Sequence, residues 1–148
     1  MSRKVSINAA AADAIRAHGI EAFPEECCGF MYGKDGEVRL ISEVQRTENI
    51  AAENRKRRFK IAPLAYIKAE RYALEQGLDF LGIYHTHPNH PAIASEHDRK
   101  QAVPHFSYVI LSVQEGEPAE LLSWELREDG QMEEQDFSET KDTILSQS

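Results

Sequence analysis

The pattern of hydrophobic and polar positions along the chain predicts helices interleaved with strands. The stretch SINAAAADAIRAH, residues 6–18, is rich in strong helix formers, with Ser6 or Asn8 suited to cap the helix and Gly19 to end it. Residues 27–50 contain an apolar run and a partly alternating run around the turn signal GKDG. They predict two strands joined as a hairpin.

The middle of the chain predicts a loop followed by a second helix. Residues 51–60 show no periodicity and carry five basic residues, which is typical of a loop. Residues 63–76 have a helical pattern, with Pro63 suited to a first turn and Gly77 to a C-cap. One face of this helix holds Ala65, Ala69, Tyr72 and Ala73. The residues that fall off this face are Leu64, Ile67 and Leu74.

The remaining pattern predicts mostly strands. The apolar run DFLGIYH, residues 79–85, is typical of a buried strand, and a short third helix is expected to start at Ser95. Residues 107–113 and 120–128 predict two strands separated by a turn, and the segment after Gly130 is expected to add one more. Helices interleaved with a mixed sheet indicate an α/β sandwich.

The length of the chain, 148 residues, suits one domain with a sizeable core. We expect residues 1–130 to form this domain and residues 131–148 to be a C-terminal strand or a polar tail. From this length we expect no second domain.

The formal net charge of −8 argues against a general nucleic-acid or anionic-membrane binder, because both need a broad positive surface. No run approaches ~18 apolar residues and the N-terminus has no apolar signal core, so we expect a cytoplasmic protein. The basic run from Arg55 to Lys60 has two open interpretations: a solvated loop, or a surface that grips an acidic protein partner. The oligomeric state is left open.

The two cysteines, Cys27 and Cys28, are adjacent, and a disulfide between them would be strained. We therefore expect reduced thiols. No pair of a histidine and an acid can be assigned beside them from the sequence, which favours buried structural thiols over a nucleophile.

Four of the six histidines lie between positions 85 and 97. His85 and His87 stand two apart at the end of a predicted strand, so their side chains point to the same side. Asp98 follows in the first turn of the predicted third helix. Two imidazole nitrogens and one carboxylate oxygen leave a fourth tetrahedral position open for water, which is typical of a catalytic zinc site.

A second interpretation of this segment needs no metal. Ser95 followed three residues later by Asp98 is also the pattern of a helix cap with an acid near the positive end of the helix dipole. A lone His-x-His is weak evidence, but its combination with Pro and with Ser-x-x-Asp favours the metal site. His90 and His97 flank it, and we expect them to be solvated or to face the substrate.

These motifs resemble the signature of the JAMM metalloproteases, also called MPN-domain peptidases: a remote Glu, then His-x-His-Pro, then Ser-x-x-Asp. The second motif is HTHP at residues 85–88, and Ser95 and Asp98 follow at the family's spacing. The segment PEECCG, residues 24–29, is similar to the Pro-x-Glu-x-Cys-Gly of bacterial members. This similarity aligns Glu26 with the family's acid/base.

The resemblance covers roughly residues 5–127 and departs from the family pattern at two positions. Ala94 stands where the family often has Pro, and Thr86 replaces the usual Ser. Neither departure removes a ligand.

The resemblance implies a single-domain JAMM/MPN fold, which is cytidine-deaminase-like, with a mixed central sheet flanked by helices. It implies a zinc-dependent peptidase or isopeptidase in which His85, His87 and Asp98 hold Zn²⁺. Glu26 would pass a proton from water to the leaving amine, and Ser95 would donate a hydrogen bond to the developing oxyanion. Similar bacterial proteins cut after the C-terminal Gly-Gly of ubiquitin-like sulfur-carrier proteins, so such a carrier is the expected partner.

Two other functions compete with this one. A non-catalytic MPN scaffold would lack ligands that are all present here, and a zinc deaminase would need a His-x-Glu and a Pro-Cys-x-x-Cys that do not occur in the sequence. For the peptidase, we expect a narrow groove along the edge of the sheet, where an extended substrate with small residues pairs with the main chain.

Overall fold

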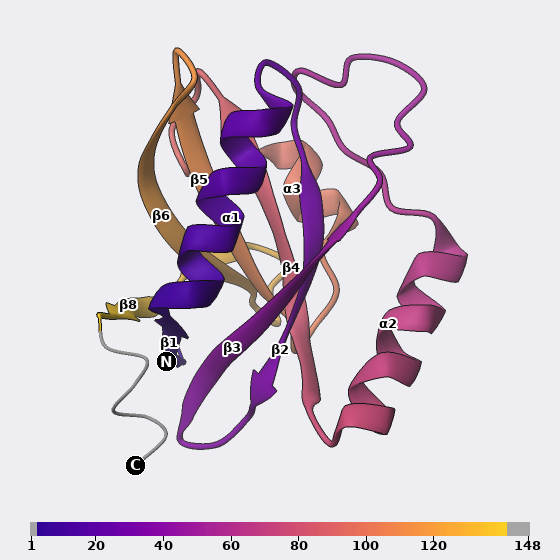
Figure 1. The fold of residues 1–148 in the computed structure, drawn as a ribbon, viewed down its shortest axis with the longest axis vertical. Helices are drawn as coiled ribbons and strands as arrows, with labels where there is room; N and C mark the ends of the chain where they lie inside the picture. Colours follow the sequence, from indigo (N-terminus) through magenta and orange to yellow (C-terminus); the bar gives the residue numbers. More distant parts are fainter. Residues whose placement is uncertain (1–2, 142–148) are drawn as a thin grey trace.

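Eight strands and three helices make up the part of the chain that this computed structural model describes, residues 3–141 (Figure 1). The helices are α1 (Ala9–Ala22), α2 (Pro63–Gln76) and α3 (Glu96–Gln101). The strands are β1 (Lys4–Asn8), β2 (Cys28–Lys34), β3 (Val38–Thr47), β4 (Asp79–Pro88), β5 (Ser107–Gln114), β6 (Glu117–Leu126), β7 (Met132–Glu134) and β8 (Asp136–Thr140). They form one sheet in the order β7-β6-β5-β4-β2-β3-β1-β8, with parallel and antiparallel pairs, which confirms the predicted mixed sheet.

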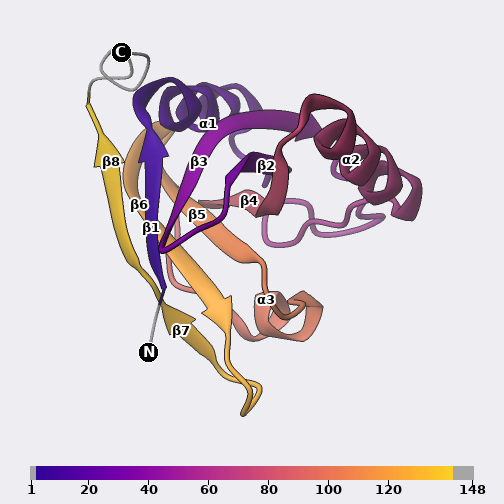
Figure 2. The same cartoon turned by 90° about the horizontal axis from the view of Figure 1, so that it is seen from below.

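The central strands are covered on both faces. α1 packs over one face, where Ile15 joins a core cluster with Tyr84 of β4. α2 packs over the other face, where Ala69 and Ala73 join a cluster with Ile83 of the same strand. Figure 2 shows α1 and α3 on opposite sides of β4 and β5. A strand buried on both faces is a rigid support for side chains at its end.

The predicted start and end of the first helix are partly wrong. Ser6 lies in β1, and the N-cap is Asn8, whose Oδ1 accepts the N–H of Ala11 at 2.8 Å. β1 forms because it pairs with β3 and β8, and this tertiary pairing outweighs the local helix propensity. Gly19 does not end the helix; it allows α1 to approach β5, because a Cβ there would lie 3.0 Å from Leu111.

The predicted hairpin, loop and second helix are confirmed. β2 and β3 pair antiparallel, residues 51–60 contain neither helix nor strand, and α2 spans residues 63–76. Gly77 is the C-cap, with a left-handed φ of 67°. The residues expected off the packed face are exposed: Leu64, Ile67 and Leu74. None of the helices in residues 3–141 is long and apolar enough to cross a membrane.

The C-terminal segment contains two short strands where one was expected. β7 pairs with β6 at one edge of the sheet, and β8 pairs in parallel with β1 at the other. Between them Gln135 is buried and accepts a hydrogen bond from Ser123. The division of the chain at residue 130 stays a prediction, and residues 142–148 of the expected tail lie outside the described residues.

Candidate metal centre

The end of β4 carries both predicted histidine ligands. His85 and His87 point to the same face of the sheet as Ile83, because side chains alternate along a strand. β4 lies between β5 and β2 in the interior of the sheet, and both imidazoles are buried, with 1% of His85 and 6% of His87 exposed. The ring of Phe59 stacks on that of His85 with centroids 4.5 Å apart and holds the imidazole from the side of the loop.

Asp98 approaches the histidines from the start of α3. Ser95 is the N-cap: its Oγ accepts the N–H of Asp98 at 3.0 Å, and Asp98 Oδ2 accepts the N–H of Ser95 at 2.9 Å. Asp98 Oδ2 also lies 3.1 Å from His87 Nε2, and Asp98 Oδ1 lies 3.2 Å from His85 Nε2. The two interpretations of this segment are therefore compatible, because the capping box itself holds the carboxylate against both imidazoles.

The donor atoms are spaced as a tetrahedral ion requires. The Nε2 atoms of His85 and His87 are 3.3 Å apart, and the ligand atoms of the three residues all lie within 4.8 Å of one another. Ligands at about 2.0–2.1 Å from a tetrahedral zinc ion are roughly 3.3 Å from one another. His87 Nδ1 lies 2.8 Å from the carbonyl of Pro91, and a proton donated there leaves Nε2 free to bind a metal. The three residues therefore fit a zinc ion.

Burial and neighbouring groups shift the pKa values of His85 and Asp98. Desolvation lowers the pKa of His85, against the charge of Asp98, and so favours the neutral imidazole that a metal requires. Burial opposes ionisation of Asp98 as well. The interactions with both histidines and with the N–H of Ser95 nevertheless hold the pKa of Asp98 below its ordinary value. The cluster thus offers two imidazole nitrogens and a carboxylate.

Glu26 is a buried carboxyl next to this cluster. Only 5% of the residue is exposed, and its Oε1 has no hydrogen-bond partner among the residues that the structure describes. Burial and the charge of Asp98 raise the pKa of Glu26 to about 9, against the opposing charge of Arg57. A carboxyl with an unpaired oxygen and a raised pKa is able to hold a proton and to give it up.

Three hydrogen bonds hold the backbone around Glu26. Its N–H donates to the carbonyl of Arg55 at 2.7 Å, and its carbonyl accepts from Asn49 Nδ2 at 3.0 Å. The next N–H, that of Cys27, donates to Thr86 Oγ1 at 2.9 Å. The loop and β4, which carries the histidines, are therefore both hydrogen-bonded to the backbone of residues 26 and 27.

The sequence reasoning included Asn49 and Phe59 in the resemblance but gave neither residue a role at the site. Asn49 Nδ2 donates to the carbonyl of Arg58 at 3.1 Å, and its Oδ1 accepts the N–H groups of Ala51 at 3.0 Å and Lys60 at 3.1 Å. One side chain thus closes the loop, while Phe59 is buried against His85. The available signals were an Asn at the start of a segment without periodicity and an aromatic residue inside a basic run.

A groove of about 350 Å³ opens beside His87. It is lined by Asn54, Arg57, Arg58, His87, His90, Ser95, Glu96 and His97. The expected position along the edge of the sheet is wrong, because the edge strands are β7 and β8, whereas β4 has a paired strand on each side. The groove lies instead between the loop and the segment that leads into α3. His90 and His97 line it but lie outside the group of three candidate ligands.

Both cysteines are free and buried. Burial raises the pKa of Cys27 to about 11 and that of Cys28 to about 12. Both thiols are therefore protonated at neutral pH, which supports the structural role expected for them.

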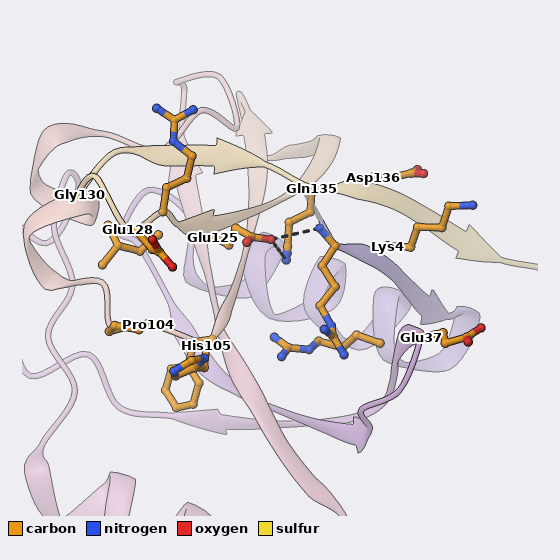
Figure 3. A pocket seen from close by; sticks show the side chains of 14 residues that line it. Lys4, Glu37, Pro104, His105, Glu125, Glu128, Gly130, Gln135 and Asp136 are labelled. Atoms are coloured by element: carbon orange, nitrogen blue, oxygen red, sulfur yellow. Dashed lines mark hydrogen bonds between the residues drawn. The ribbon is translucent and has the colours of Figure 1, made fainter. Parts of the chain in front are cut away.

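A larger hollow, of about 1080 Å³, lies near the start of β5 (Figure 3). Inside it Glu125 Oε2 accepts the N–H of Arg3 at 3.3 Å and the side-chain amide of Gln135 at 2.7 Å. Its charged lining has both signs: Arg3, Lys4, Arg39 and Arg127 against Glu37, Glu125, Glu128 and Asp136. It contains none of the candidate ligands, so its size does not mark the reactive site.

Comparison with known proteins identifies the family. Residues 8–127 match the family described as prokaryotic homologs of the JAB domain. The chain belongs to this family. Membership of the prokaryotic JAB family confirms the resemblance to bacterial JAMM/MPN proteins that the motifs indicate, and the matched residues include Glu26, both histidines and Asp98.

Two relatives of this JAB-domain chain are a desampylase and a probable protease. It is 31% identical over 116 residues to the desampylase of Haloferax volcanii. The aligned region covers 75% of this chain and 82% of the relative. It is 34% identical over 97 residues to the probable TtuB-protein conjugate cleaving protease of Thermus thermophilus. The aligned region covers 64% of this chain and 61% of the relative.

Solved structures share the fold. A protein from Desulfitobacterium hafniense aligns with a TM-score of 0.82 and 25% identity, covering 97% of this chain and 98% of that one. A protein from Salinibacter ruber aligns with a TM-score of 0.70 and 37% identity, covering 93% of each chain. A JAB1/MPN domain protein from Archaeoglobus fulgidus, at 14% identity, aligns with a TM-score of 0.55 over 90% of this chain and 98% of that one. This last likeness confirms the predicted JAB1/MPN fold.

Proposed function

We propose that the chain is a zinc-dependent isopeptidase that hydrolyses the amide bond after the C-terminal Gly-Gly of a ubiquitin-like sulfur-carrier protein. The observation that carries this proposal is the convergence of His85, His87 and Asp98 beside the buried, unpaired carboxyl of Glu26. The names of the relatives, a desampylase and a protease that cleaves TtuB conjugates, support the reaction and the class of substrate.

The metal would be held by His85, His87 and Asp98. A bound zinc ion lowers the pKa of a water ligand toward neutrality and polarises a carbonyl. Residues of the chain would transfer the proton and stabilise the oxyanion. The positive charge of a bound ion would favour the ionised form of Glu26 over the protonated form. The carboxylate would then take a proton from the attacking water and pass it to the leaving amine, a transfer that contributes roughly a hundredfold or more.

Ser95 would act on the substrate oxygen while it caps α3. Its Oγ accepts the N–H of Asp98, so the hydroxyl proton remains available to donate. Ser95 also lines the groove beside His87. A hydrogen bond from this hydroxyl to the developing oxyanion is typically worth ~3 kcal/mol.

The alternative is a non-catalytic scaffold of the same fold. It is disfavoured by the buried carboxyl of Glu26, because its unpaired oxygen costs about 1–3 kcal/mol of stability. A protein that only binds partners has no use for such a destabilising group. A complete set of candidate ligands argues in the same direction.

Hydrolysis of a defined carrier fusion tests the proposal. The proposed Gly-Gly substrate predicts a preference for small residues before the cut bond. Fusions with Gly-Gly, Ala-Gly or Leu-Leu before that bond are compared at matched concentrations, with and without a chelator. We expect chelator-sensitive cleavage that is fastest after Gly-Gly. Cleavage that survives complete removal of metal would refute a metallopeptidase, and equal rates for Leu-Leu and Gly-Gly would refute the choice of substrate.

A further inference from the structure

The loop of residues 51–60 concentrates positive charge in an acidic protein. It carries five basic residues and one acidic residue, in a chain whose net charge is −8. The basic side chains are all exposed: Arg55, Lys56, Arg57, Arg58 and Lys60. Among residues 3–141, none of these five forms an ion pair, although other arginines of the chain do. The positive charge of this loop is therefore available to an outside partner.

The backbone of this loop is held in place, although the side chains of Arg57, Arg58 and Lys60 make no hydrogen bonds or ion pairs among the described residues. The N–H groups of Arg57 and Arg58 both donate to the carbonyl of Asn54 at 3.0 Å, and Asn49 ties the loop on both sides. The buried ring of Phe59 anchors it beside His85. A held backbone presents its charges at a low entropic cost of binding.

The same cations border the candidate reactive groove. Arg57 and Arg58 line the groove beside His87. Arg58 and His97 also line a second hollow of about 280 Å³, which extends past Lys60. A chain bound in the groove beside His87 would therefore lie next to Arg57 and Arg58.

We propose that Arg57, Arg58 and Lys60 form a docking surface for an acidic segment of the substrate protein, next to the bond that is cut. This inference rests on the proposed function, since it names the chemistry that the same site selects in its substrate. The excess of acidic residues elsewhere in the chain repels such a substrate, so the loop also directs it to the groove.

Two substrates and two double variants test this surface. The substrates are carrier fusions with the same Gly-Gly bond, flanked by Glu and Asp in one and by Gln and Asn in the other. The test variant is Arg58→Gln with Lys60→Gln, whose side chains make no hydrogen bonds among the described residues. Arg57 is left intact because its charge also acts on Glu26. The control is Lys68→Gln with Arg71→Gln, which removes the same charge from exposed positions on α2.

We expect the unaltered protein to prefer the acidic fusion by roughly threefold to tenfold in kcat/KM at low salt, mainly through KM. The preference should fall clearly in the Arg58 and Lys60 variant, where Arg57 alone remains of the surface, and it should persist in the control. It should also shrink as salt is raised. Thermal unfolding should not differ between the two variants.

Three results would overturn the docking surface: equal cleavage of both fusions by the unaltered protein, an unchanged preference in the test variant, or the same loss in the control. Each of these leaves the proposed function standing, since the Gly-Gly bond is still cut. Failure to cut either fusion refutes the proposed function instead. Inhibition of the unaltered protein by a short DNA oligonucleotide, absent in the test variant, would assign the surface to nucleic acid and also refute the docking proposal.

Discussion

Thr86 Oγ1 accepts the backbone N–H of Cys27, which joins the strand that carries both histidines to the residue after Glu26. Thr86 is fully buried, and its own N–H donates to the carbonyl of Cys27 at 3.1 Å. The Thr86 side chain thus helps to position the acid/base candidate relative to the candidate metal ligands.

We predict that Thr86→Val lowers kcat while metal content is unchanged. Valine has nearly the same shape but leaves the buried N–H of Cys27 unpaired, which should cost about 1–3 kcal/mol of unfolding free energy and loosen the Glu26 segment. The matched control is Thr86→Ser, which keeps the hydroxyl and should restore activity. If Val and Ser behave alike, the hydrogen bond has no role in positioning Glu26.

We predict about one zinc ion per chain, bound through His85, His87 and Asp98. His85→Ala, His87→Ala and Asp98→Ala should each lose the metal, because two ligands do not hold it. Elemental analysis of the purified proteins decides this. His90→Ala, a histidine of the same groove, is the control and should keep the metal. Unchanged metal content after both His85→Ala and His87→Ala would show that the site is wrongly assigned.

Glu26→Gln should keep the metal and lose hydrolysis by orders of magnitude. The amide has the shape of the carboxyl but cannot accept and release the proton. Activity and metal content are measured on the same preparation, with Glu25→Gln as the control. Loss of metal together with activity would make Glu26 a ligand, and undiminished activity would make it a bystander.

Ser95 should show two separable roles. Ser95→Ala removes both the hydroxyl and the N-cap, so it should lower kcat and cost ~1 kcal/mol of unfolding free energy. Ser95→Gly should leave stability within a few tenths of a kcal/mol, because glycine is tolerated at an N-cap, yet lower kcat by about a hundredfold to a thousandfold. Equal kcat for Ser95→Gly and the unaltered protein would limit Ser95 to capping α3.

The pH dependence of stability should include a contribution from His18. Burial and the charge of Arg46 lower the pKa of His18 to about 4, and its Nδ1 lies 2.7 Å from the hydroxyl of Tyr84. In the unfolded chain this imidazole takes up a proton near its ordinary pKa of 6.5. Between these values the unfolded state binds more protons, so the contribution is complete above pH 6.5 and is lost as the pH falls toward 4.

Urea unfolding at several pH values measures this effect. His18→Gln should lose less stability than the unaltered protein as the pH falls across that range. The control is His105→Asn at an exposed position with a φ of 77°, which asparagine tolerates. A slope that is the same with and without His18 would contradict the prediction.

The sequence by itself determined the parts of the site that are close along the chain. The period of two along β4 directs His85 and His87 to one face, and Ser95 and Asp98 are three residues apart because a capping box requires it. α2 was predicted with the right bounds because Pro63 and Gly77 act locally on its two ends.

The tertiary structure alone decided what distant segments do to one another. β1 is a strand because β3 and β8 pair with it. The local helix propensity of residues 4–8 does not depend on these distant strands and so could not predict the pairing. Family resemblance indicated Glu26, but its raised pKa depends on burial and on the charge of the distant Asp98, and its backbone is held by a hydrogen bond from Asn49. Hydrogen bonding, desolvation and charge all depend on distance in space, and only the folded chain sets those distances.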